Sequence, residues 1–277
     1  MTIDEIIDAA LKEDIGDGDH TSDSCIPASA KGKAKLLVKE DGIIAGVELA
    51  QRIFTRFDKD LRIEVFVEDG SSIKVGDVIL TVEGSSRSIL KTERLVLNFM
   101  QRMSGIATKT ANLNKLIEGT SAKLLDTRKT TPLLRELEKQ AVKIGGGVNH
   151  RIGLYDMVMI KDNHIDMAGG IQQAIERVHR HLKSIGKELK IEIEVRDFDE
   201  LNEVLSVGGV HRIMLDNFHP DDEKKAVKLI AGRFETEASG GITETTIRAH
   251  ALSGVDYISV GALTHNIKSL DLSLKAA

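Results

Sequence analysis

The second part of the chain alternates short apolar runs with stretches of helical spacing, and this alternation constrains the fold more than any other feature. Six runs have the length of strands, at 123–127, 155–160, 191–195, 211–215, 235–238 and 256–260. Stretches with apolar residues three and four apart separate or precede them, at 106–118, 132–143, 169–185, 198–206, 221–232 and 243–253. Strands that recur with helices between them favour parallel βα units. Because the units are fewer than a complete barrel has, we predict an incomplete parallel α/β barrel over 105–265.

The first third of the chain has a different, mixed pattern. Segments with helical spacing and segments with β-rich runs lie at 2–12, 33–39, 61–68, 73–84 and 87–103. Such a mixture, with a glycine- and aspartate-rich turn region after the first helix, indicates a separate α+β domain over 1–104. The chain as a whole is therefore predicted to be of the α/β class.

The composition excludes several classes of protein. The chain of 277 residues has a formal net charge of −5, 3% aromatic residues and no Trp, which argues against nucleic acid as a partner. One cysteine, Cys25, cannot form an intrachain disulfide and indicates a reducing compartment. The sequence has neither a basic-then-apolar signal segment nor an apolar run of about 20 residues. We therefore expect a cytoplasmic protein that does not bind a membrane.

The stretch 102–163 is basic within this acidic chain. It holds eleven Lys and Arg against six Asp and Glu, so the remaining residues carry a net charge of −10. Four of the cations follow short apolar runs, where a βα barrel has its active site: Arg128, Lys129, Arg151 and Lys161. Cations that converge on one edge form a site for a ligand with several negative charges. Four others at helical spacings are expected to be solvated: Lys115, Lys123, Lys139 and Lys143.

Polar or small residues end each predicted barrel strand. They are Thr127, Arg128, Lys129, Lys161, Glu194, Asp216, Ser239, Gly240, Gly241, Ser259, Val260 and Gly261. Because the carboxyl ends of the strands of a βα barrel share one rim, we expect these residues to face a common ligand. The turns 239–241 and 259–261 consist of small residues, whose backbone N–H groups suit a phosphate.

Four ionisable residues near this rim have more than one interpretation. Glu194 and Asp216 either form structural ion pairs or bind a sugar diol or a magnesium-bound polyphosphate. His150 is either a core histidine or a donor to a carboxylate, and the adjacent cation favours the second interpretation. Lys161 could be a Schiff-base nucleophile, although the acidic residue that follows it disfavours this role.

Seven stretches of the sequence together resemble those of one known family. They are 11–21, 93–108, 126–132 (Asp-Thr-Arg-Lys-Thr-Thr-Pro), 149–154 (Asn-His-Arg-Ile-Gly-Leu), 159–165, 214–218 and 237–242 (Glu-Ala-Ser-Gly-Gly-Ile). The family is quinolinate phosphoribosyltransferase, the decarboxylating nicotinate-nucleotide pyrophosphorylase of NAD biosynthesis. The resemblance covers essentially the whole chain.

The resemblance implies an open α/β N-terminal domain on an incomplete parallel α/β barrel. The C-terminal tail, 266–277, is expected to return to the N-terminal domain. The family also implies a homodimer or higher even oligomer with shared active sites, in which Arg102 reaches in from the neighbouring subunit.

The resemblance also implies the reaction and the roles of residues. The phosphoribosyl group of phosphoribosyl pyrophosphate is transferred to quinolinate with decarboxylation, giving nicotinate mononucleotide, pyrophosphate and CO₂, and Mg²⁺ is the expected cofactor. The residues implied to hold the quinolinate carboxylates and the phosphates are Arg102, Thr127, Arg128, Lys129, His150, Arg151 and Lys161. Glu194 and Asp216 are expected to bind the ribose hydroxyls and Mg²⁺, and the turns 239–241 and 259–261 the 5′-phosphate. The predicted catalytic residues are Lys129, Lys161, Glu194 and Asp216.

Three alternatives remain open at this point. The first is a paralogue of the same fold that acts on another aromatic acid, and the second is a barrel enzyme with Lys161 as a Schiff base. The third is a carrier module, because 71–84 looks like half of a biotinyl or lipoyl domain. No lysine of that segment lies in the hairpin sequence that such carriers modify, and the barrel would be unexplained.

Overall fold

The computed structural model describes all residues, 1–277, and they form two compact units that interleave along the chain. The sheet unit comprises Met1–Ala111, Thr130–Gly146 and Ala262–Ala277. The barrel unit comprises Asn112–Lys129 and Gly147–Gly261. The sequence suggested a single division near residue 104, and that domain boundary stays a prediction. After that point, the segments 130–146 and 262–277 belong to the sheet unit.

The sheet unit is built on a four-stranded antiparallel sheet in the order β12-β1-β5-β3. Its strands are β1 (Lys31–Val38), β3 (Arg62–Val65), β5 (Val78–Ser85) and β12 (Leu272–Ala276), and a two-stranded sheet joins β2 (Gly42–Ile43) to β4 (Ser72–Ile73). In β1 the residues Ala34, Leu36 and Val38 are buried and their neighbours are not, the alternation expected of a strand with one covered face. The C-terminal strand β12 pairs with β1, so the tail of the chain belongs to this sheet.

The same unit also contains six helices or parts of helices. They are α1 (Ile3–Ile15), α2 (His20–Cys25), α3 (Val47–Phe57), most of α4 (Ser86–Leu116), α5 (Arg135–Ile144) and α11 (Ala262–His265). Helix α1 begins with a capping box, in which Thr2 and Glu5 each accept the other's backbone N–H. The buried residues of α1 are Ile6 and Ile7, one turn further along.

Helix α4 is a single helix of 31 residues, where the sequence indicated two helical segments. It continues through Gly105, and the reason for a glycine there is steric. A Cβ atom at Gly105 would lie 2.3 Å from the carbonyl oxygen of Lys268 in the C-terminal segment. None of the helices, α4 included, has a stretch that is long and apolar enough to span a bilayer.

The barrel unit contains six parallel strands in the order β6-β11-β10-β9-β8-β7. They are β6 (Lys123–Leu125), β7 (Val158–Ile160), β8 (Ile191–Val195), β9 (Arg212–Asp216), β10 (Glu235–Ser239) and β11 (Tyr257–Ser259). Each of the six overlaps one of the runs predicted from the sequence, with ends that differ by up to three residues. A parallel bridge between Leu125 and Val148 extends the row beyond β6, and no ladder joins β6 to β7. The incomplete parallel barrel predicted from the sequence is therefore confirmed.

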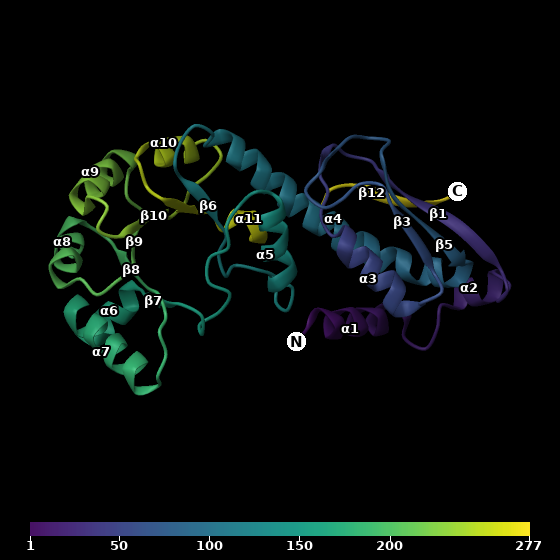
Figure 1. The fold of residues 1–277 in the computed structure, drawn as a ribbon, viewed down its shortest axis with the longest axis horizontal. Helices are drawn as coiled ribbons and strands as arrows, with labels where there is room; N and C mark the ends of the chain where they lie inside the picture. Colours follow the sequence, from purple (N-terminus) through teal and green to yellow (C-terminus); the bar gives the residue numbers. More distant parts are fainter. The chain divides into compact units, whose positions relative to one another are not determined.

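The helices of the barrel unit lie outside the curved row of strands, where Figure 1 shows α7, α8, α9 and α10 side by side. Their bounds are α6 (Asp162–Ala168), α7 (Ile171–Ser184), α8 (Phe198–Val207), α9 (Pro220–Ile230) and α10 (Ile247–Leu252). Alternate residues of a strand point to opposite faces, so Ile191, Ile193 and Val195 of β8 share one face. Glu192 and Glu194 share the other, inner face.

The inner face of the middle strands is polar. Residues in register there include Glu192 and Arg212 on β8 and β9, and Asp216 and Ser239 on β9 and β10. Every residue of β8 is buried, the two glutamates included. Buried charged side chains need oppositely charged or hydrogen-bonding partners, and here those partners lie on the inner face of the barrel.

Candidate active site at the carboxyl ends of the barrel strands

The strand topology brings the predicted rim residues to one edge. Because β6 to β11 are all parallel, the segments that follow them emerge on the same side of the sheet. Those segments hold Thr127, Arg128, Lys129, Lys161, Gly240, Gly241, Val260 and Gly261. Asp216, Ser239 and Ser259 are the last residues of β9, β10 and β11, and Glu194 lies one residue before the end of β8.

Lys161, Glu194 and Asp216 form one cluster at this edge. Lys161 is the residue between β7 and α6, and its Nζ lies 2.7 Å from Oε2 of Glu194. Partial burial raises the pKa of Asp216, the negative charge of Glu194 raises it further, and Lys161 opposes both effects. Two carboxylates thus share one ammonium group, which leaves negative charge for a metal ion or for hydroxyl donors.

The same ion pair bears on the Schiff-base alternative. A Schiff-base lysine must present an unprotonated amine, and such amines are found near other cations or in apolar pockets. Lys161 instead contacts a carboxylate that is only 8% exposed. This environment favours a lysine that acts through its positive charge.

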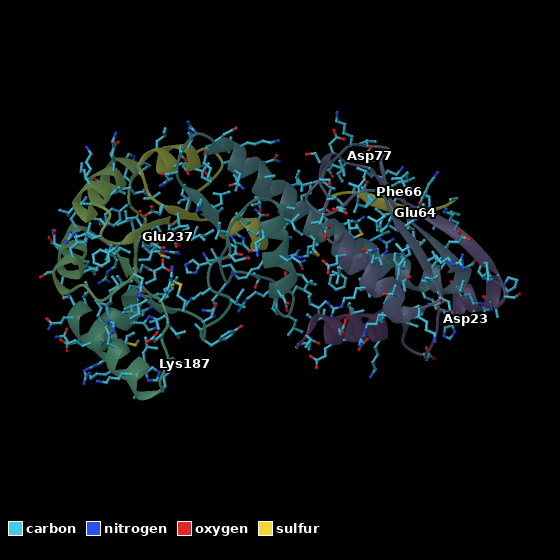
Figure 2. The ribbon with its side chains drawn as sticks, in the orientation of Figure 1. Asp23, Glu64, Phe66, Asp77, Lys187 and Glu237 are labelled. Carbon is cyan, nitrogen blue, oxygen red and sulfur yellow. The ribbon has the colours of Figure 1, made fainter.

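His150 lies in a second cluster, deeper on the inner face of the barrel. Its Nε2 is 3.0 Å from Oε2 of Glu192 and 3.4 Å from Oε2 of Glu237, and both carboxylates are fully buried. Nη1 of Arg212 lies 3.1 Å from the same oxygen of Glu237. We call His150, Glu192, Arg212 and Glu237 the buried charge network; Glu237 is labelled in Figure 2, among the strands of the barrel unit.

The network makes His150 a better base than a free histidine. Burial alone lowers the pKa of the imidazole, but hydrogen bonds with Glu192 and Glu237 outweigh it and raise the pKa to about 9. Burial, together with the charge of Glu237, raises the pKa of Glu192 to about 7. Nε2 of His150 is the ring nitrogen that faces the two carboxylates, and Nδ1 lies 2.7 Å from the backbone nitrogen of Arg151.

The network also has the ligand atoms of a possible metal site. One atom each from His150, Glu192 and Glu237 lies within 4.8 Å of the others. Arg212, however, contacts Glu237 from β9, and its guanidinium also lies 4.1 Å from the centre of the Tyr257 ring. Because a cationic side chain already contacts the carboxylates, we interpret this group as a charge network. The oxygen-only pair of Glu194 and Asp216 suits Mg²⁺ better.

Arg128 and Arg151 lie near one another at the first strand. Burial lowers the pKa of the Arg151 guanidinium, and the charge of Arg128 lowers it further. Buried Asp126 accepts the backbone N–H of His150 at 2.8 Å and the side-chain amide of Asn149 at 2.5 Å, which holds the segment 148–151 beside β6. Two neighbouring guanidinium groups repel each other, and a bound dianion relieves that repulsion.

The two predicted phosphate turns differ in their geometry. Gly240 and Gly241 have φ values of 101° and 58°, a conformation that favours glycine. In the second turn the N–H of Val260 donates to the carbonyl of Leu125 at 3.0 Å. That N–H group is therefore part of the sheet, and among 239–241 and 259–261 the first turn is the better phosphate cradle.

Arg102 is held inside the sheet unit by α5. Its Nε and Nη2 lie 2.8 and 2.6 Å from Oε1 of Glu138, and Nη2 is also 2.7 Å from Oγ1 of Thr131. Glu138 is 1% exposed, so Arg102 is the charge partner of a buried carboxylate. The adjacent Lys139 is also buried, and its prediction as a solvated lysine was wrong, whereas Lys115, Lys123 and Lys143 are exposed.

Sequence reasoning missed the acids beneath the rim. It considered Glu194 and Asp216 as the only acids near the cations, yet Asp126, Glu192 and Glu237 are buried there as well. The signal was present in 191–195 (Ile-Glu-Ile-Glu-Val) and 235–239 (Glu-Thr-Glu-Ala-Ser), where charge alternates with apolar or small residues. In a barrel with helices outside, such alternation places charge on the inner face.

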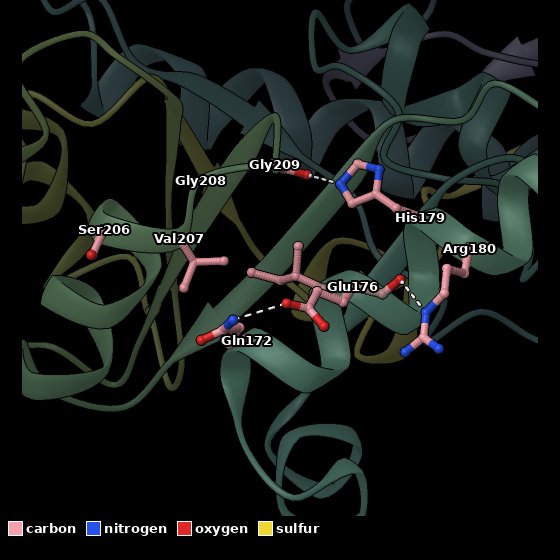
Figure 3. Close-up of a pocket in the computed structure, with 9 residues that line it drawn as sticks. Gln172, Glu176, His179, Arg180, Ser206, Val207, Gly208 and Gly209 are labelled. Atoms are coloured by element: carbon pink, nitrogen blue, oxygen red, sulfur yellow. Dashed lines mark hydrogen bonds between the residues drawn. The ribbon is translucent and has the colours of Figure 1, made fainter.

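A surface hollow of about 620 Å³ lies elsewhere on the barrel unit, between α7 and the loop from α8 to β9 (Figure 3). Nε2 of His179 donates to the carbonyl of Gly209 there at 2.7 Å. Gly208 and Gly209 precede β9, so the hollow is at the amino ends of the strands. No predicted site residue lines it. The hollow is therefore separate from the rim residues at the carboxyl ends of the strands.

Comparison with known proteins places this geometry in a family. The family models described as "Quinolinate phosphoribosyl transferase, N-terminal domain" and "C-terminal domain" match residues 19–104 and 106–275. Quinolinate phosphoribosyltransferase [decarboxylating] 2b, mitochondrial, of Nicotiana tabacum is 46% identical over 98% of this chain and 81% of its own length. Nicotinate-nucleotide pyrophosphorylase [carboxylating], chloroplastic, of Arabidopsis thaliana is 48% identical with the same coverage.

Solved structures agree in fold over the full length. NadC from Streptococcus pyogenes is 40% identical, with a TM-score of 0.92 over 99% of this chain and 96% of that chain. The nicotinate-nucleotide pyrophosphorylase from Francisella tularensis is also 40% identical, with a TM-score of 0.93 and the same coverage. With both domain models matched and relatives above 40% identity, this chain belongs to the quinolinate phosphoribosyltransferase family.

Proposed function

We propose that this enzyme transfers the phosphoribosyl group of phosphoribosyl pyrophosphate to quinolinate and releases pyrophosphate and CO₂, to give nicotinate mononucleotide for NAD biosynthesis. The family supports the reaction class. The observation that carries the proposal is the rim itself, where a pair of neighbouring arginines and a pair of neighbouring carboxylates lie at the ends of one parallel sheet. These are complementary to a dicarboxylate and to a ribose with a metal-bound pyrophosphate.

The cations bind quinolinate in this proposal. Arg128 and Arg151 neutralise its two carboxylates, with Lys129 and Thr127 on the same loop after β6. His150 contributes a positive charge that the buried carboxylates sustain. Both substrates are polyanions, and the cations overcome their mutual repulsion so that the pyridine nitrogen can approach the anomeric carbon.

The acids and the glycine turn bind phosphoribosyl pyrophosphate. Glu194 and Asp216 accept hydrogen bonds from the ribose hydroxyls and hold Mg²⁺, and Lys161 offsets the excess negative charge of the pair. Mg²⁺ supplies charge neutralisation for the pyrophosphate that leaves. The 5′-phosphate binds the turns 239–241 and 259–261, chiefly the first.

The chemistry needs no organic cofactor. Departure of pyrophosphate gives positive charge at the anomeric carbon, which the carboxylates of Glu194 and Asp216 stabilise. Attack by the pyridine nitrogen makes that nitrogen quaternary and positive. The electron pair of the bond to the 2-carboxylate then moves into the ring as CO₂ leaves, and the ring carbon takes up a proton. Lys129 and Lys161 hold the charged groups in place during both steps.

Assembly and location complete the proposal. We infer a homodimer or higher even oligomer in which Arg102 of one subunit serves the site of the next, as the family resemblance implies. A cytoplasmic location is consistent with the single free cysteine, Cys25, although the plant relatives named above are mitochondrial and chloroplastic.

An assay with purified protein tests the proposal. Quinolinate, phosphoribosyl pyrophosphate and Mg²⁺ are expected to yield pyrophosphate and CO₂ together. Activity with a different aromatic acid in place of quinolinate would identify a paralogue. Borohydride trapping of Lys161 with a carbonyl substrate would instead support the Schiff-base alternative.

A further inference from the structure

Asn217 has an unusual backbone conformation at the rim. It follows Asp216 directly after β9 and has a φ of 56°, one of three non-glycine residues with positive φ in the described chain. The others are Leu133 and Ala231. This conformation costs free energy for any residue with a side chain, and asparagine is among the few that tolerate it. Glycine would satisfy the backbone alone, so the side chain needs a separate explanation.

Asn217 contacts both parts of the site that bind phosphoribosyl pyrophosphate in the proposed function, through its side chain and its backbone. Its Nδ2 donates to Oδ2 of Asp216 at 2.7 Å. Its backbone N–H donates to the carbonyl of Ser239 at 2.8 Å, at the end of β10. A Cβ on Gly240 would lie 2.2 Å from Oδ1 of Asn217, so the turn is packed directly against this amide.

These contacts have a consequence for Asp216. Its carboxylate is half-buried and repelled by Glu194, and a donor on Oδ2 fixes the rotation of the group. The other oxygen, Oδ1, is then oriented by the same hydrogen bond. A carboxylate fixed in this way loses less conformational freedom when a ligand binds.

We propose that Asn217 is a positioning residue that couples the ribose-binding carboxylate of Asp216 to the phosphate turn at Ser239–Gly240, and so sets the affinity for phosphoribosyl pyrophosphate. The inference rests on the proposed function. Its amide is committed to Asp216, so Asn217 neither donates a proton in the reaction nor accepts one. The left-handed backbone conformation lets this one residue contact both Asp216 and Ser239.

Three substitutions separate the backbone from the side chain. Asn217→Gly keeps the left-handed conformation without strain and removes the amide. Asn217→Ala also removes the amide but retains the strain, so it should have the lower melting temperature of the two. Asn217→Asp retains size and tolerance of positive φ but replaces the donor with a carboxylate that repels Asp216. Ala231→Gly is the matched control, because it relieves a left-handed residue that precedes β10 at the other end of the strands.

The measurement is the KM for phosphoribosyl pyrophosphate with saturating Mg²⁺, together with the KM for quinolinate and the calorimetric affinity for magnesium phosphoribosyl pyrophosphate. Asn217→Gly and Asn217→Ala should both raise the first KM and weaken binding by about tenfold or more, as loss of a hydrogen bond to a charged group does. The KM for quinolinate should change by less than about twofold. Asn217→Asp should be at least as impaired, and Ala231→Gly should match the wild type.

Two outcomes would overturn the inference. The first is wild-type affinity in Asn217→Gly, which would assign Asn217 a backbone role alone. The second is an activity that falls only as the melting temperature falls, so that Asn217→Ala is impaired and Asn217→Gly has normal activity. Failure of the proposed function is a different result, because the wild type itself would then neither bind magnesium phosphoribosyl pyrophosphate nor turn over quinolinate.

Discussion

Replacement of Arg102 should reduce both stability and activity, and the two effects can be separated through Glu138. Arg102 makes two hydrogen bonds to Oε1 of a carboxylate that is 1% exposed. Removing one partner of a buried ion pair costs about 3–5 kcal/mol. The backbone N–H of Thr131, 3.2 Å from Oε2, continues to stabilise Glu138, so we expect the lower end of that range. For Arg102→Met this corresponds to a decrease in melting temperature of roughly 6–12 °C.

The double substitution Arg102→Met with Glu138→Gln should restore most of the stability. Glutamine is neutral and can still accept the N–H of Thr131, so no unpaired charge remains. It should not restore activity, because Arg102 is proposed to contact a substrate. The assays are thermal unfolding and the rate of pyrophosphate release. The matched control is Arg56→Met, which breaks exposed pairs with Asp8 and Asp4 and should change neither the melting temperature appreciably nor the activity.

Either of two results would refute this reasoning. If the double variant regains wild-type activity, Arg102 serves only to neutralise Glu138. If Arg102→Met is as stable as Arg56→Met, the buried ion pair does not have the energetic role assigned to it here.

Three further predictions follow from the site. Asp216→Asn and Glu194→Gln should lower kcat/KM chiefly through the KM for phosphoribosyl pyrophosphate, and unchanged kinetics in both would make these acids structural. The raised pKa of His150 contributes stability that is complete below pH 6.5 and is lost as pH rises through about 9. The difference in melting temperature between the wild type and His150→Gln should therefore shrink over that interval, and a constant difference would contradict the raised pKa. Mixing the stable Arg102→Met, Glu138→Gln variant with Lys161→Ala, with subunit exchange, should restore up to about half of the sites in heterodimers, and no recovery despite heterodimers would place Arg102 in its own subunit's site.

The sequence predicted the barrel strands and the polar residues at their ends well, for a physical reason. Each strand is short, apolar on its outer face and followed by polar or small residues, so the apolar run and the residues after it together identify the strand. Lys161 and Glu194 were both placed at one rim, and they lie 2.7 Å apart. Their pairing could not be predicted, because spacing along the chain does not define which strands are neighbours.

The inner face of the barrel was the main omission. Glu192, Arg212 and Glu237 are buried because they neutralise one another and His150, and no single strand reveals that balance. Lys139 was misplaced for the same reason, since a charged residue at helical spacing is normally solvated. The continuous helix through Gly105 was also missed, because a glycine in a helical pattern indicates a break unless a close backbone neighbour explains it.

The central claim is that this site decarboxylates quinolinate after phosphoribosyl transfer. The most direct test is quinolinate labelled in its 2-carboxylate, incubated with phosphoribosyl pyrophosphate, Mg²⁺ and the purified protein. Labelled CO₂ and pyrophosphate should appear in equal amounts, and nicotinate, which lacks that carboxylate, should be used far less well. Equal kcat/KM for the two acids, or pyrophosphate release without labelled CO₂, would contradict the account.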